Sequence, residues 1–220
     1  MQQHHRVGAA DAEVAGQWAN DRLADVGVVW SPGDFDVAAA LELEFLTALV
    51  WAPVEESRRV VHALVGDRSV RAVSDQPLDA IPLSSALFLS PTHQAVFGAV
   101  VELVDAGTPP TPMLLGAHAR AYSSSREERH EFRRGLLDVT SPAGRVPVAA
   151  ELPHLARSLV DAWYRRGYVA LTLRMGTVID HAPPGELSRN WAQLSVHERT
   201  ATRRREAVRS ALDSRQRSRG

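Results

Sequence analysis

The sequence predicts an all-α fold, in which a compact helical head is followed by a long antiparallel helical hairpin. Aromatic residues make up only 6% of the 220 residues, and no segment alternates apolar and polar residues as a half-buried strand does. Serine–proline and threonine–proline pairs, which are favourable helix starts, recur along the chain. Near the C-terminus, two long runs of helical periodicity are separated only by Pro183-Pro184-Gly185.

The N-terminal part of the chain predicts three helices. The first covers about 11–28 and ends at Ser31-Pro32-Gly33, where proline and glycine break the pattern. Asp34 or Asp36 is a suitable N-cap for the second helix, which Pro53 ends. The apolar side of this second helix carries Leu41, Phe45, Leu49 and Val50. The third helix carries Val60, Val61, Leu64 and Val65 and stops at Gly66.

The middle of the chain predicts three further helices with clear start signals. Ser90-Pro91 places a capping hydroxyl before a proline that has no amide hydrogen to lose, and this helix ends at Gly107. Thr111-Pro112 repeats the same start. Ser125 opens another helix, which ends before Ser141-Pro142. The apolar residues of the three helices are Val96, Phe97, Val100, Val101, Leu103, Val104, Met113, Leu114, Leu115, Phe132, Leu136 and Leu137.

The two C-terminal runs, at about 153–181 and 186–212, predict the arms of the hairpin. At roughly 1.5 Å per residue each arm is some 40 Å long, which is more than a head of this size can cover. We therefore expect part of the apolar stripe to be covered by a second copy, in a dimer or larger assembly. Three aromatic residues of the two arms suit either such an interface or the core of the hairpin itself: Trp163, Tyr164 and Trp191. The predicted self-association interface consists of Leu159, Trp163, Tyr164, Leu173 and Trp191.

These patterns divide the chain into four parts. Residues 1–40 form an acidic N-terminal extension that is predicted to be helical, and residues 41–146 form the head. Residues 147–213 form the hairpin. Residues 214–220 alternate arginine with serine and glutamine and are predicted to be disordered.

The residue types that are missing exclude several classes of chemistry. The chain has no cysteine, which excludes disulfides, thiolate nucleophiles and cysteine-based metal sites. It also has no lysine, so all 25 basic residues are arginine. A Walker A nucleotide-binding loop and Schiff-base catalysis both need lysine and are therefore excluded.

No catalytic constellation is recognisable in the sequence. His130-Glu131 and His197-Glu198 each begin a zinc-protease motif, but Arg134 and Ala201 stand where the second histidine is required. Glu42 and Glu44 lie two residues apart on a helix and so face different directions. We expect a protein that is not an enzyme and that binds no metal or cofactor.

The net charge of −1 conceals two regions of opposite sign. Up to Glu56 the chain carries ten acidic residues and two arginines, whereas from Arg199 onward it carries eight arginines and two acidic residues. Such polarity fits contacts between the two ends, an acidic partner for the tail, or two solvated helix faces. The candidate residues for contact with nucleic acid or an acidic protein are Arg199, Arg203, Arg204, Arg205 and Arg209.

Five segments of the chain, in the order in which the family has them, resemble the N-terminal domain of hexameric replicative DNA helicases of the DnaB family. The chain reads LFLSPTHQAVFGAVVEL at 87–103 and GTP at 107–109, where the family pattern has phenylalanine, Pro-x-His, an aliphatic–aromatic pair and Gly-x-Pro. The stretch LELEFLTALV at 41–50 is similar to the opening helix of the family. Leu136-Leu137 with Thr140-Ser141-Pro142, and 155–166 with its Arg165-Arg166, complete the resemblance.

The resemblance implies a structural role for Phe88, His93, Phe97, Gly107 and Pro109, with His93 packing and hydrogen-bonding beneath Phe97. In the family this domain forms the helicase collar, pairs through its hairpin and offers a surface to primase and loading factors. Residues 1–40 have no recognised counterpart, and the segment 52–87 is longer than in the family. The family continues into an ATP-driven RecA-like motor, which we expect to be absent here because the chain has no lysine.

Two functional hypotheses follow from the sequence. The first is a non-catalytic protein-interaction module of DNA replication that binds or modulates helicase, primase or a loader. The alternative is a stand-alone DNA-binding regulator that uses the arginine-rich C-terminal helix. No apolar run approaches the ~20 residues of a membrane span, and the N-terminus is not a secretory signal, so a cytoplasmic location is expected.

Overall fold

The computed structural model describes residues 32–66, 80–81, 87–122, 125–141 and 147–214. These residues are helical almost throughout and contain no strand, which confirms the predicted all-α class. The expected helix at 11–28, the tail beyond Ser214 and most of the acidic extension lie outside the described residues. The helices are α2 (Pro32–Trp51), α3 (Val54–Val65), α4 (Pro91–Asp105), α5 (Pro112–Tyr122), α6 (Arg126–Thr140), the 3₁₀ turn η2 (Ala149–Glu151), α7 (Leu152–His181) and α8 (Pro184–Asp213).

The predicted start signals are confirmed at three helices, and at α5 the Thr111 hydroxyl accepts a hydrogen bond from the Leu114 amide at 3.4 Å. The Ser90 hydroxyl accepts a hydrogen bond from the His93 amide at 3.3 Å, with Pro91 as the first residue of α4. Ser125 and Glu128 form a capping box at the start of α6. Gly107, which follows α4, has a φ of 70°, a backbone conformation that glycine adopts without strain.

The first helix of the head departs from the sequence prediction. Helix α2 begins at Pro32, so Asp34 and Asp36 lie inside its first turns and are not N-caps. The boundary predicted between residues 40 and 41 consequently falls within a helix. Proline suits the first turn of a helix because it needs no hydrogen-bonded amide there. The predicted end of the preceding helix stays a prediction, because the residues before Pro32 lie outside the described ones.

Helix α2 lies at the centre of the head and packs against α4, α6 and α7. The rings of Phe45, Phe88 and Phe97 form a cluster at its heart, with centroids 5.1 to 6.2 Å apart. Helix α6 approaches α4 so closely at Gly135 that a Cβ there would collide with Thr92. Not every apolar residue predicted for these helices is internal: Met113 is 78% and Leu137 is 57% exposed.

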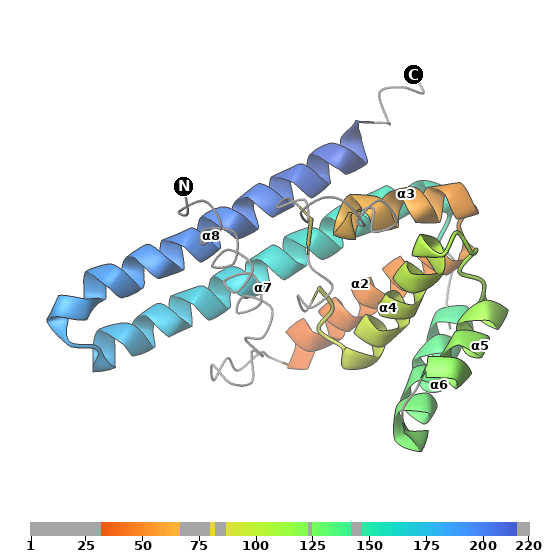
Figure 1. Ribbon diagram of the computed structural model, residues 1–220, viewed down its shortest axis with the longest axis horizontal. Coiled ribbons are helices and arrows are strands. Elements are labelled where there is room, and N and C mark those ends of the chain that lie inside the picture. The colour runs from red at the N-terminus through yellow and green to blue at the C-terminus, as the bar shows by residue number, and fades with distance from the viewer. Residues whose placement is uncertain (1–31, 67–79, 82–86, 123–124, 142–146, 215–220) are drawn as a thin grey trace, which may run out of the picture.

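Helices α7 and α8 form the predicted antiparallel hairpin, and only two residues separate them. Figure 1 shows the pair running past the head at the end that carries the hairpin turn. The opposite, proximal end belongs to the head, because residues of both arms join the same core cluster as α2 and α4: Leu152, Ala156, Leu159, Val160, Trp163, Ala201, Val208 and Leu212. Head and proximal hairpin therefore share one core.

Candidate interaction surface

The hairpin has a buried proximal half and an uncovered distal half. Between residues 171 and 193, on either side of the turn, no side chain is buried. Large apolar side chains of α7 and α8 are nevertheless exposed there: Leu173 is 37%, Ile179 59% and Trp191 58% exposed. Large apolar side chains that stay exposed over one half of a helical hairpin make that half a candidate interface. We call Leu173, Ile179 and Trp191 the distal hairpin face.

Two residues that the sequence assigned to the self-association interface lie elsewhere. Leu159 is fully buried and Trp163 is 3% exposed, both within the core shared with the head. They are therefore unavailable to a partner in this structure, and the prediction for them was wrong. Helical periodicity identified the apolar stripe correctly but could not show that α2 covers its proximal half.

Tyr164 holds the two arms of the hairpin together. Its hydroxyl lies 3.0 Å from the hydroxyl of Thr202 and donates to Glu198 at 3.4 Å. The guanidinium of Arg205 lies over its ring, 5.0 Å from the centroid. Only Leu173 and Trp191 of the five predicted interface residues thus belong to the distal hairpin face.

The five arginines predicted as a contact band on α8 do not form one surface. Arg204 is only 6% exposed. Arg205 and Arg209 both bind Asp161 on α7, at 2.6 and 2.8 Å. Arg199 and Arg203 are exposed. Part of the arginine run therefore stabilises the hairpin instead of facing a partner, because consecutive positions on a helix point in different directions.

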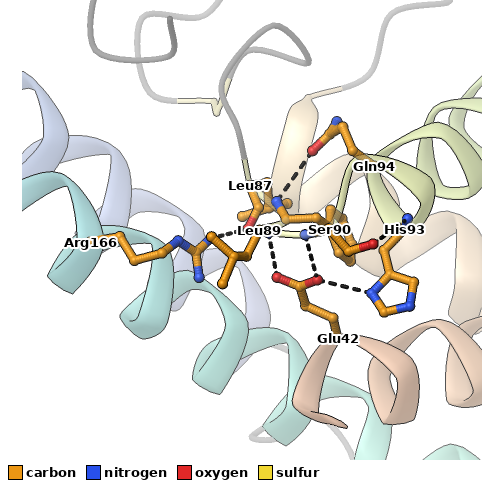
Figure 2. A network of polar contacts seen from close by, with 8 residues as sticks. Glu42, Leu87, Leu89, Ser90, His93, Gln94 and Arg166 are labelled. Carbon is orange, nitrogen blue, oxygen red and sulfur yellow. Dashed lines mark hydrogen bonds and ion pairs between the residues drawn. The ribbon is translucent and has the colours of Figure 1, made fainter. Parts of the chain in front are cut away.

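A buried polar network, which the sequence did not predict, joins the head to the hairpin. Its centre is Glu42 on α2, which is 1% exposed. The carboxylate accepts hydrogen bonds from the amides of Leu89 and Ser90, and it pairs with Nδ1 of His93 at 2.9 Å. Figure 2 shows these groups converging on the segment before α4.

The same segment is held from two other helices. Gln94 on α4 accepts from the amide of Phe88 at 3.2 Å, and Arg166 on α7 donates to the carbonyl of Leu87 at 2.6 Å (Figure 2). A non-helical segment that enters a core must find partners for its backbone polar groups. Side chains of three helices supply those partners to residues 87–90.

Arg166 is 6% exposed, which is unusual for a charged side chain. Burial lowers the pKa of its guanidinium below the ordinary value, and the negative charge of Glu42 partly offsets that effect. The network thus places a compensating charge near each buried ion.

One sequence signal could have revealed the network. Glu42 occupies a position on the apolar side of α2, one turn before Phe45 and Leu46, where a carboxylate requires a buried partner. Glu44 is exposed, in agreement with the expectation that the two carboxylates face different directions. The partner of Glu42 could not be identified, because Arg166 is far away in the sequence.

Of the residues that the family resemblance marked as structural, Phe88 and Phe97 are buried in the core. His93 makes the expected hydrogen bond, with Glu42 as its partner. Within the described ranges, no group of three or more histidine, aspartate or glutamate side chains could hold a metal ion. No helix in that part of the chain has both the length and the apolar character that crossing a membrane requires.

The chain is similar to the replicative DNA helicase DnaB of Treponema pallidum (strain Nichols), with 28% identity over 152 residues. The aligned segment is 69% of this chain and 32% of the helicase, so the chain spans about a third of its relative. The similarity supports a relation to the N-terminal region of that protein. No protein-family model matches the chain, and no solved structure matches it.

Proposed function

We propose that this chain is a non-catalytic protein-interaction module of DNA replication, which binds or modulates a replicative helicase, a primase or a helicase loader. The observation that carries the proposal is the similarity over 152 residues to part of a replicative helicase. The distal hairpin face is the surface through which we expect the module to act. The head leaves its three side chains uncovered, and the hairpin of a second copy or a helical partner would bury them.

Wild-type protein is expected to show no ATP hydrolysis above the blank, with or without DNA. The chain has no lysine with which to bind the phosphates of ATP in a Walker A loop. The measurement is phosphate release from purified full-length protein. Hydrolysis that persists through further purification would contradict the assignment as a non-enzyme.

Affinity capture from the native host, with mass spectrometry of the captured proteins, tests the proposal directly. Wild-type chain is expected to recover helicase, primase or a loader. Trp191→Glu is expected to recover less of the same protein, because Trp191 belongs to the distal hairpin face and is 58% exposed. Met113→Glu is the matched control, since Met113 is an even more exposed apolar residue on the head.

Recovery of none of the three replication proteins would contradict the proposed function. Loss of the partner with Met113→Glu, but not with Trp191→Glu, would place the interaction on the head and contradict the role of the hairpin. The alternative function, DNA binding through the arginine band of α8, is weakened by the burial of Arg204 and by the pairing of Arg205 and Arg209 with Asp161.

A further inference from the structure

A groove between the two arms of the hairpin combines aromatic rings with arginines. It has a volume of about 410 Å³ and is lined by Asp161, Tyr164, Arg165, Tyr168, Val169 and Arg205. Pockets that hold small ligands commonly measure about 300–1,000 Å³. The groove lies beside the buried face of α7 and is separate from the network around Glu42.

The two tyrosines form a short aromatic ladder along the groove. They are one helical turn apart on α7, with ring centroids separated by 6.1 Å and an interplanar angle of 43°. The Tyr164 ring is covered by Arg205, whereas Tyr168 is 50% exposed. An exposed aromatic face on a rigid helix is a platform on which a planar base can stack.

The charges around the rings favour an anion. Asp161 binds both Arg205 and Arg209, so this group of one carboxylate and two guanidinium groups carries a net positive charge. Arg205 uses its Nε–H for Asp161 at 2.6 Å, which fixes its guanidinium at the groove. Arg165 is exposed and adds a further positive charge. Glu198 lies near but is engaged by Tyr164 and Thr202.

We infer that this groove binds one nucleotide unit of single-stranded nucleic acid, with a base stacked on Tyr168 and the adjacent phosphate bound by Arg165. Arginine suits phosphate because its planar guanidinium can donate two parallel hydrogen bonds. An acidic peptide would use the positive charge but not the tyrosine ring, so the stacking platform favours nucleic acid. This site goes beyond the proposed protein-interaction function and differs from the arginine band that the sequence predicted.

Fluorescence anisotropy with a labelled oligothymidylate of about 20 nucleotides tests the inference on the full chain. The wild type is expected to bind it. Tyr168→Ala is expected to weaken binding at least about fivefold through lost stacking, while Tyr168→Phe retains the ring and stays within about twofold of wild type. Arg165→Ala is expected to weaken binding by a similar factor and to reduce the slope of log affinity against log salt by about one.

Arg134→Ala serves as the charge-matched control. Arg134 is an exposed arginine on α6, which Figure 1 shows apart from the hairpin, and its loss is expected to leave affinity unchanged. Absence of oligothymidylate binding at tens of micromolar protein would overturn the inference, as would equal losses for Arg134→Ala and Arg165→Ala. Wild-type affinity in Tyr168→Ala would also overturn the inference. So would displacement of the labelled oligothymidylate by polyglutamate as effectively as by unlabelled oligothymidylate, because either result would show a surface that binds through charge alone.

Discussion

Replacement of Leu159 by glutamate is expected to unfold the protein. Leu159 is completely buried in the core that the hairpin shares with the head. An unpaired charge at such a position costs several kcal/mol, against a total stability of about 5–15 kcal/mol for a typical domain. The expected result is loss of the cooperative thermal transition measured by circular dichroism.

Leu173→Glu on the same helix is the matched comparison. Leu173 is 37% exposed in the distal half of the hairpin, so the variant is expected to fold with a melting temperature close to that of the wild type. Its effect should appear in assembly instead. We expect the wild type to be a dimer or larger by light scattering, and Leu173→Glu or Trp191→Glu to give a smaller species, because a charge at the centre of an interface shifts binding by orders of magnitude.

Two results would contradict this interpretation. A wild-type protein that remains monomeric at tens of micromolar would exclude self-association through the distal hairpin face. A Leu159→Glu variant that melts like the wild type would show that the proximal half of α7 is not part of the core. The pair of variants thus separates a buried stripe from an exposed one on a single helix.

Removal of the Glu42 carboxylate is expected to produce the largest loss of stability among substitutions of polar residues. Glu42→Ala leaves the amides of Leu89 and Ser90 without their acceptor and removes the negative charge that partly offsets the burial of Arg166. Breaking a buried ionic network by removing one partner typically costs about 3–5 kcal/mol. The measurement is the free energy of unfolding from urea denaturation.

Neighbouring substitutions give the controls for this experiment. Glu44→Ala removes an exposed carboxylate from the same helix and is expected to change the free energy of unfolding by less than about 0.5 kcal/mol. Glu42→Gln keeps one acceptor oxygen and is expected to cost less than Glu42→Ala. Equal stability of Glu42→Ala and Glu44→Ala would contradict the role of Glu42 in holding residues 87–90.

The sequence determined the elements whose causes are local. Ser90 and Ser125 cap their helices as expected because a cap needs only a side-chain oxygen within reach of amides two or three residues further on. The long periodic runs predicted the hairpin because two long helices with apolar stripes, joined by a short turn, bury those stripes by packing antiparallel. Local chemistry misled at Asp34 and Asp36, which are suitable caps by residue type but lie inside a helix that begins at Pro32.

Tertiary structure alone decided which residues of each stripe are free. Leu159 and Leu173 occupy the same kind of position in the sequence pattern, yet α2 covers only the first of them. Arg204 and Arg205 are neighbours, but one is buried and the other binds Asp161 on the opposite arm. Periodicity shows which side chains lie on the same face of a helix, whereas their burial depends on which distant segment packs against that face. For the same reason, Glu42 and Arg166 come together with residues 87–90 only when α2, α4 and α7 pack around them.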